Sequence, residues 1–245
     1  MSTLDPDTVV SSLVTERPSR ATVLDALGID YCCNGHRTVV QACASAGIGV
    51  AELRDALQNH DASSDEADTE VSAAWATMRI GELTDHIEGV HHTYTHETMP
   101  RLGSLADKVV GVHGDRHPEL SEIQGAYQAL RSELESHLMK EERVLFPMCR
   151  ELDSAEGTPE FHCGTLQNPI RVMGQEHDVA GELLARLRRL SSDYTPPDDA
   201  CESYRALYAG LEELEADLHL HIHKESNVLF PAVLAREAEL ADATG

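Results

Sequence analysis

Lysine is scarce in this sequence of 245 residues, which holds three lysines beside sixteen arginines. Acidic residues outnumber basic ones by 43 to 19, and the formal net charge is −24. A surface this negative repels nucleic acid and anionic membranes, so neither is an expected partner. Hydrated carboxylates keep proteins soluble where salt screens their mutual repulsion. The composition is therefore typical of a protein that works in a salt-rich cytoplasm. An acidic face that binds a basic partner is the alternative explanation.

The sequence has no apolar run long enough to cross a bilayer and no signal-peptide pattern, which predicts a cytoplasmic protein with cysteines mostly as thiols. Its six cysteines show no Cys-x-x-Cys spacing, which argues against a zinc ribbon or a thioredoxin-type redox motif. It has no Gly-x-Gly-x-x-Gly segment, so nothing indicates a flavin or nicotinamide cofactor. No alternating strand pattern occurs either, and the predicted fold class is all-α.

An internal repeat is the most informative feature that is present. The segment 137–147, HLMKEERVLFP, returns as 221–231, HIHKESNVLFP, with seven of eleven positions identical at an offset of 84 residues. A repeat of this length indicates a duplicated structural unit. Each copy has a histidine and a glutamate four residues apart, which lie on the same face of a helix. Each copy therefore offers one imidazole and one carboxylate to a single point.

In both copies the His–Glu pair interrupts an apolar stripe whose steps of four and three residues are typical of a packed bundle seam. The stripes are Ile123, Tyr127, Leu130, Leu134, His137, Glu141, Val144 and Met148, and Leu207, Leu211, Leu214, Leu218, His221, Glu225, Val228 and Ala232. A buried carboxylate without a partner costs on the order of several kcal/mol. Two copies facing each other therefore indicate a metal site, and two metal-free His–Glu hydrogen bonds are the alternative.

Two further helices supply histidines. A third stripe carries His177 at the same kind of position: Leu166, Ile170, Met173, His177, Ala180, Leu184 and Leu187. The fourth helix, about residues 77–110, contains His86, His91, His92 and His96. Periodicity with its apolar positions favours His91, whereas the duplication favours His92, which lies 85 residues before His177. We prefer His92 and keep His91 as the alternative.

The predicted ligand set is four histidines and two glutamates from four helices. Imidazole and carboxylate suit iron, zinc or manganese. Glu141 and Glu225 are placed to bridge two metals, which leaves two histidines for each. Ferritin-like di-metal bundles use Glu-x-x-His motifs and more carboxylates. Here the order is His-x-x-x-Glu, and histidines outnumber glutamates among the predicted ligands. This ligand balance distinguishes the chain from the ferritin-like bundles.

The chain divides into three predicted parts. Residues 1–58 form a small module of short helices that contains Tyr31-Cys32-Cys33-Asn34-Gly35. Residues 59–74 form an acidic linker, and residues 75–245 form a four-helix bundle built from a duplicated helical hairpin. A disulfide between Cys32 and Cys33 would require a strained ring, so free thiols or a bond to another chain are expected.

The bundle sequence resembles the hemerythrin-like di-iron domain. The resemblance lies in the His-x-x-x-Glu pairs, the Leu-Phe-Pro segments that follow them, and the single histidines of the other two helices. Together with the Tyr-Cys-Cys-x-Gly motif, they make nearly the whole chain similar to the repair-of-iron-centres (RIC, ScdA/YtfE-type) proteins. The resemblance implies a non-haem, oxo-bridged centre of two iron ions with these ligands: His92, His137, Glu141, His177, His221 and Glu225. A stretch at residues 157–164, with His162 and Cys163, departs from the pattern and has no assigned role.

The resemblance also implies a function. The protein would repair or protect iron–sulfur clusters damaged by nitric oxide or oxidants by donating iron to iron–sulfur client proteins. Cys32 and Cys33 would take part in redox or iron transfer, since the module of this family is associated with iron handling. The sequence specifies neither the client nor the reductant, and it leaves a homodimer open.

Two alternatives use the same bundle. One is a hemerythrin-like carrier or sensor of O₂ or NO, and the other is a di-iron enzyme that reduces NO with an added electron donor. Hemerythrins proper have more histidine ligands than the four found here. Spare histidines lie near the predicted site, at His91, His96, His219 and His223.

Overall fold

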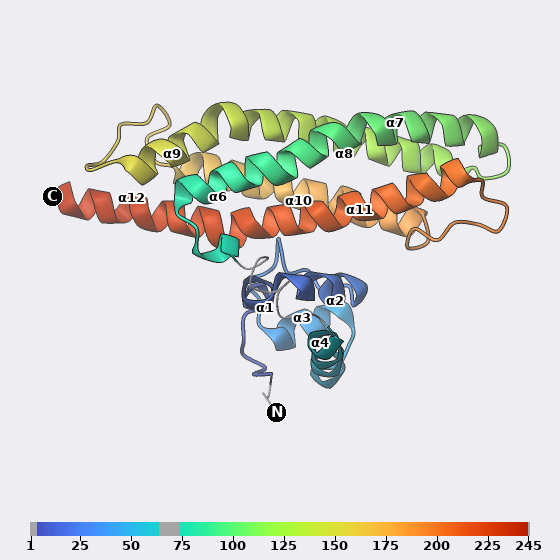
Figure 1. Ribbon diagram of the computed structural model, residues 1–245, viewed down its shortest axis with the longest axis horizontal. Coiled ribbons are helices and arrows are strands. Elements are labelled where there is room, and N and C mark those ends of the chain that lie inside the picture. The colour runs from blue at the N-terminus through green and yellow to red at the C-terminus, as the bar shows by residue number, and fades with distance from the viewer. Residues whose placement is uncertain (1–3, 64–73, 245) are drawn as a thin grey trace.

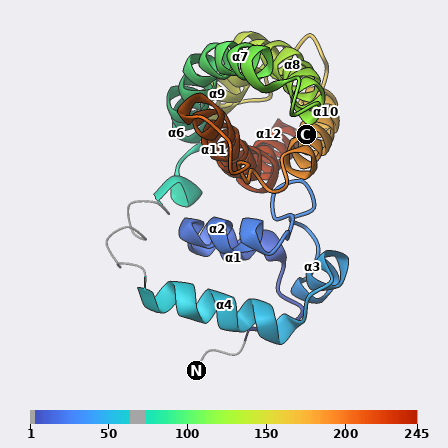
Figure 2. The same cartoon turned by 90° about the vertical axis from the view of Figure 1, so that its right-hand side faces the viewer.

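The computed structural model of the protein describes residues 4–63 and 74–244, and all regular elements in these two ranges are helices. Long helices form an elongated bundle, and a smaller group of short helices lies against one side of it (Figure 1). Viewed along its length, the bundle is a closed ring of helices with the small module beside it (Figure 2). The predicted all-α architecture, a helical bundle with an N-terminal module, is confirmed.

The module has its own apolar core. It comprises α1 (Val10–Glu16), a 3₁₀ turn (Pro18–Arg20), α2 (Ala21–Ala26), α3 (Val39–Ala46) and α4 (Val50–Ser63). Its centre is filled by Val10, Leu24, Tyr31, Val39 and Leu53, of which none is more than 1% exposed. Helix α4 continues past residue 58, where the sequence places the end of the module. Residues 64–73 of the predicted linker lie outside the described residues.

The bundle consists of two helical hairpins. In the first, α6 (Ile80–Ile87) continues through the turn Glu88–His92 into α7 (Thr93–His113), and α8 (Glu119–Lys140) through Glu141–Leu145 into α9 (Phe146–Ser154). In the second, α10 (Gln167–Leu190) is followed by α11 (Glu202–Lys224), which continues through Glu225–Leu229 into α12 (Phe230–Thr244). A short 3₁₀ turn (Ala74–Thr77) precedes α6. No helix in the described ranges has both the length and the apolar character needed to cross a membrane.

Three of the four bundle helices contain a π-helical turn at or just after the predicted metal ligands: 88–92, 141–145 and 225–229. A π turn adds a residue to the helical repeat, so everything beyond it is rotated relative to a continuous α-helix. The prediction that Val144 and Ala232 belong to the buried seams is therefore wrong. Both are exposed, while the residues that directly follow them, Leu145 and Val233, are fully buried in the core.

The module packs on one face of α11 and the turn that follows it. His219 Nδ1 lies 2.8 Å from the Asp25 carboxylate. Two helical turns later, Asn227 donates a hydrogen bond of 2.9 Å to the carbonyl oxygen of Cys32. Ile222, on the same helix, belongs to the module's apolar core. The Cys-Cys motif is thereby fixed against a helix that also carries a predicted ligand.

Candidate metal centre

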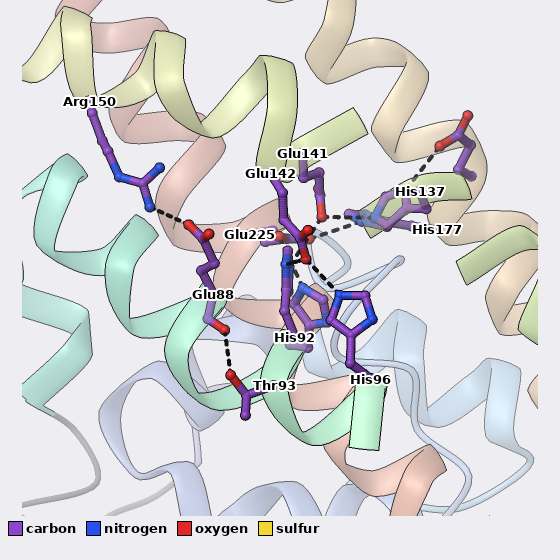
Figure 3. A network of polar contacts seen from close by, with 12 residues as sticks. Glu88, His92, Thr93, His96, His137, Glu141, Glu142, Arg150, His177 and Glu225 are labelled. Carbon is purple, nitrogen blue, oxygen red and sulfur yellow. Dashed lines mark hydrogen bonds and ion pairs between the residues drawn. The ribbon is translucent and has the colours of Figure 1, made fainter. Parts of the chain in front are cut away.

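The six residues predicted as ligands lie together inside the bundle: His92, His137, Glu141, His177, His221 and Glu225. Figure 3 labels all of them except His221. They form two groups, in each of which one ligand atom per residue lies within 4.8 Å of the others. One group holds His92 and His221, the other holds His137 and His177, and both contain the two glutamates. Such an arrangement would suit two cations that share two carboxylates.

Glu141 is completely buried and faces two imidazoles. Its Oε2 lies 3.4 Å from His92 Nε2 and 3.3 Å from His137 Nε2. Neither oxygen of this carboxylate has a hydrogen-bond partner among the described residues. Leaving a buried charged acceptor unsatisfied costs roughly 1–3 kcal/mol or more. The orphaned oxygens therefore favour a cation that they would coordinate.

Glu225 repeats this pattern in the second half of the bundle. Its Oε2 lies 3.1 Å from His177 Nε2, and its Oε1 lies 3.1 Å from His221 Nε2. Within the described chain, Glu225 Oε2 and His177 Nε2 lack hydrogen-bond partners as well. Four imidazole nitrogens aimed at two buried carboxylates form a donor set that suits iron, zinc or manganese. The residues present therefore fit a pair of such cations.

Neighbouring side chains hold the imidazoles with Nε2 inward. Three of the four have Nδ1 next to a polar side chain: Glu142 at 3.1 Å for His92, Glu176 at 3.0 Å for His137, and Ser226 at 3.1 Å for His177. Lys140 in turn makes an ion pair with Glu176. Such partners fix the tautomer and the ring orientation of metal-binding histidines and raise their basicity. The ring of His177 also stacks on Phe230, with 6.0 Å between centroids.

The charges of the site compensate one another. Burial alone would lower the pKa of His137, but the negative charge of the nearby Glu141 carboxylate raises it to about 9. Burial alone would raise the pKa of Glu225, but the imidazoles of His221 and His177 hold it well below its usual value. Both glutamates therefore stay ionised, and the raised pKa values of His92 and His137 favour protons there that balance the negative charge. A bound cation would replace those protons.

His91 and His92 are both buried, because the π turn Glu88–His92 directs two consecutive side chains into the bundle. Only His92 joins the cluster. The His91 ring stacks on His221 at 5.3 Å, with its Nδ1 2.8 Å from Asp217 and its Nε2 2.7 Å from Lys224 Nζ. Burial lowers the pKa of Lys224 to about 8. His91 therefore supports the ring of a predicted ligand from outside the cluster.

Comparison with known proteins agrees with this geometry. A model described as the hemerythrin HHE cation binding domain matches residues 83–233, and one described as a domain of unknown function, ScdA_N, matches residues 6–61. The chain is 35% identical over 228 residues to a Haemophilus influenzae protein named probable iron-sulfur cluster repair protein, covering 92% of this chain and 96% of that one. It is 36% identical over 231 residues to the iron-sulfur cluster repair protein YtfE of an Enterobacter species, covering 94% and 98%. The Escherichia coli protein of the same name is 33% identical over 231 residues, with the same coverage.

The chain belongs to this family of iron–sulfur cluster repair proteins. The bundle is accordingly a cation binding domain of the hemerythrin type, and its match spans all six predicted ligands. The ScdA_N match covers the Tyr31–Gly35 motif. The predicted resemblance is thus confirmed for both parts of the chain.

The spare histidines of this repair protein are engaged elsewhere. His96 is half-exposed and lies 2.8 Å from a carboxylate oxygen of Glu142. His219 and His223 face the module, where His223 Nδ1 lies 3.3 Å from the carbonyl oxygen of Tyr31. None of the three belongs to the two groups around Glu141 and Glu225. His219 and His223 instead hold the module against the bundle.

The Cys-Cys motif lies between the module and α10. Cys32 is buried, Cys33 is partly exposed, and both are free thiols with 3.8 Å between their sulfurs. Cys33 Sγ lies 3.8 Å from the carbonyl oxygen of His177. A cavity of about 510 Å³ opens beside the two cysteines, with α10 and α11 as its far wall. The structure thus brings the thiols next to a predicted ligand, although they are far apart in sequence.

In the unassigned stretch 157–164, residues 161–164 form a tight turn closed by a bridge between Phe161 and Gly164. Cys163 packs on the core, 4.0 Å from the sulfur of Met148, and His162 is exposed. Neither residue belongs to the two groups around Glu141 and Glu225. The stretch therefore covers the end of the bundle.

Sequence reasoning missed the residues that orient the ligands. Glu142 and Glu176 directly follow and precede predicted ligands, at Glu141 and His177, so both look like ordinary solvent-facing acids. In both repeats a lysine directly precedes the glutamate of the His-x-x-x-Glu pair. This lysine was the only sequence signal for an orienting residue, because Lys140 pairs with Glu176. Ser226 gives no signal in the sequence.

Proposed function

We propose that this protein repairs iron–sulfur clusters damaged by nitric oxide or oxidants, by holding two iron ions in its bundle and delivering iron to damaged clusters. The observation that carries the proposal is the pair of four-residue groups sharing Glu141 and Glu225, with buried oxygens that lack partners. The relatives named iron-sulfur cluster repair proteins, which this chain matches over more than nine-tenths of its length, support the same function.

The six ligand residues would hold the ions, with the two glutamates bridging and two histidines for each ion. Bound iron supplies both a redox-active cation and the cargo for repair. The carboxylates can change their mode of binding without moving the helices, and neutral imidazoles hold iron less firmly than a thiolate cage. Protonation of the ligands would promote release.

Burial controls access to the ligands. None of the six is more than 5% exposed, so iron cannot leave unless the surrounding side chains move. The module side is the favoured exit, because Cys33 already touches the backbone of His177 there. Cys32 and Cys33 would then receive the iron on its way to the client.

A small cavity favours a second candidate function, the binding of NO or O₂. The cavity measures about 10 Å³ and is lined by residues that include His137, His177 and His221. This volume accommodates about one water-sized molecule. A diatomic gas could reach the histidines through such a space, whereas a larger ligand could not.

Metal analysis combined with a repair assay tests the main proposal. The purified chain should contain two iron ions after iron-replete expression. The iron-loaded protein should reactivate a hydro-lyase whose [4Fe–4S] cluster has been damaged by NO. The double variant Glu141→Gln/Glu225→Gln should lose both properties, whereas Glu151→Gln, at an exposed position of α9, should keep both. Tightly held zinc, or reactivation that does not require the protein-bound iron, would refute iron donation.

A further inference from the structure

The cleft between the module and the bundle is strongly acidic. Its lining includes the carboxylates of Asp25, Asp30, Asp178, Glu182 and Glu215, besides Arg188 and His219. The two basic side chains are already paired: Arg188 binds Glu215 at 2.6 Å, and His219 binds Asp25. Asp30, Asp178 and Glu182 therefore leave the cleft with net negative charge, which attracts cations.

Two thiols and a carboxylate meet at the edge of this cleft. Asp30, Cys32 and Cys33 each place one ligand atom within 4.8 Å of the others. Cys32 Sγ lies 3.8 Å from Cys33 Sγ and 3.4 Å from Asp30 Oδ1. Around a tetrahedral cation with metal–sulfur bonds of about 2.3 Å and a metal–oxygen bond of about 2.0–2.2 Å, ligand atoms are roughly 3.4–3.8 Å apart. The two contact distances match such a site.

Hydrogen bonds fix the turn that carries these groups. Asp30 Oδ1 accepts from the backbone N–H of Cys32, Cys33 and Asn34 at 3.1, 2.9 and 3.2 Å. The side-chain amide of Asn34 donates to Asp30 Oδ2 at 2.6 Å. On the bundle side, Asn227 binds the carbonyl of Cys32. The spacing of the three groups is therefore set before any ligand arrives, which lowers the cost of binding.

The same arrangement is poor for thiol redox chemistry. A disulfide requires about 2.05 Å between sulfurs, and adjacent cysteines reach it only through a strained ring. A neighbouring carboxylate also repels the thiolate that disulfide exchange needs. A bound cation would offset the repulsion between the carboxylate and the thiolates, because it attracts all three groups.

We propose that Asp30, Cys32 and Cys33 form a third metal site, for a single divalent cation such as ferrous iron or zinc, with a fourth position open to the cleft. On binding, two S–H bonds break, two metal–sulfur bonds form, two protons leave to solvent, and no electrons are transferred. The site rests on the proposed function in one respect: it would be the transfer point for iron that leaves the bundle. Contact between Cys33 Sγ and the backbone of His177 places it beside that centre.

Cadmium titration of the full-length protein, with its bundle already loaded with iron, tests the site. Cadmium is chosen because thiolate-to-cadmium charge transfer gives an ultraviolet absorption that reports sulfur ligands. We expect one equivalent of cadmium to bind with this absorption and to release about two protons. Cys32→Ser and Cys33→Ser should each abolish the signal.

Two further variants sharpen the result. Asp30→Asn keeps an oxygen that can accept the backbone hydrogen bonds of the turn, so the loop should fold, yet it should bind cadmium at least tenfold more weakly. Cys201→Ser removes an exposed thiol at the start of α11 and should leave the titration unchanged. An unchanged signal in Cys32→Ser, or its loss in Cys201→Ser, would overturn the proposal.

The outcome can be separated from that of the repair function. If the iron-loaded protein reactivates damaged clusters but shows no thiolate–cadmium absorption, the third site is wrong and the repair function stands. If cadmium binds as expected but the bundle holds no iron and reactivates no cluster, the repair function is wrong and the third site stands.

Discussion

Cys33 Sγ lies 3.8 Å from the carbonyl oxygen of His177, so the Cys-Cys motif of the module touches the backbone of a predicted metal ligand. This contact depends on the module being docked, through His219 and Asn227, on α11. It links the two parts of the chain, which match separate family models. Changes that undock the module should therefore affect repair without emptying the bundle.

Gly35 allows this docking, and Gly35→Ala should disturb it. A Cβ at residue 35 would lie 2.3 Å from the carbonyl oxygen of Tyr31, 2.7 Å from Asn227 Oδ1 and 2.8 Å from Ser11 Cβ. We expect a loss of roughly 1–3 kcal/mol in the free energy of unfolding, as for other overpacked sites. Hydrogen exchange in residues 10–57 should become faster, while the metal content stays the same.

Gly49→Ala is the matched control for this prediction. Nothing lies within 4 Å of a Cβ built at residue 49 in the same module. This variant should be neutral or stabilised by a few tenths of a kcal/mol, on the order expected from reduced freedom of the unfolded chain. Equal exchange rates in both alanine variants would show that Gly35 does not govern docking.

Glu176 should tune the metal site without binding metal. Glu176→Gln removes the charge that holds His137 Nδ1 and pairs with Lys140. Loss of such an outer partner typically lowers metal affinity about 10–100-fold. Competition with a chromophoric chelator measures this affinity, with the exposed Glu151→Gln as control. Equal affinities for the two variants would contradict the orienting role of Glu176.

Replacing either of the two glutamates that we propose as bridging ligands should have a stronger effect. Glu141→Ala or Glu225→Ala should lower the metal content and the stability together, because each removes a fully buried carboxylate shared by two groups. In the unmodified protein, a ligand at 100 times its Kd adds about 2.7 kcal/mol to the free energy of unfolding. Chelation should therefore lower the melting temperature of the wild type markedly and that of either variant little. Full occupancy by two metals in either variant would refute the bridging assignment.

The π turn predicts opposite outcomes for the same substitution at neighbouring positions. Val144 is 40% exposed and Leu145 is 1% exposed. Val144→Lys should change the free energy of unfolding by less than about 0.5 kcal/mol. Leu145→Lys buries an unpaired charge and should cost more than about 3 kcal/mol. Denaturant unfolding of both variants measures the difference. A larger loss of stability in Val144→Lys than in Leu145→Lys would contradict the π turn and support an uninterrupted α-helical stripe.

Much of the fold and the candidate site could be predicted, because both depend on helical periodicity and on an internal repeat. The seams around His137 and His221 place each His–Glu pair in the core, and the offset of 84 residues relates the two halves. Periodicity fails where a π turn adds a residue. For that reason Val144 was wrongly placed inside, and His91 could not be distinguished from His92 by spacing alone.

The contacts between the parts of the chain could not be predicted, because they join residues that are distant in sequence. His219 and His223 look like spare ligands, since they flank His221 on the same helix. Their role as docking residues depends on Asp25 and Tyr31, and nothing in the local sequence points to these partners. The cleft beside the thiols exists only once the module has docked.

The stability of the module should depend on pH through Asp61. Burial alone would raise the pKa of Asp61, but hydrogen bonds and ion pairs with Arg20 and Arg17 lower it. A carboxyl group whose pKa is lower in the folded state stabilises the protein above its unfolded pKa, and this contribution is lost as the pH falls through the folded value. Asp61→Asn should therefore cost about 1 kcal/mol at neutral pH, and the difference from wild type should shrink below about pH 3.9, the unfolded value. Hydrogen exchange of α1 and α4 at several pH values measures this difference, with Asp55→Asn, which removes an exposed carboxylate beside Arg54, as control. A difference that stays constant down to pH 2 would show that the Asp61 ion pairs do not fasten α4 to the start of the module.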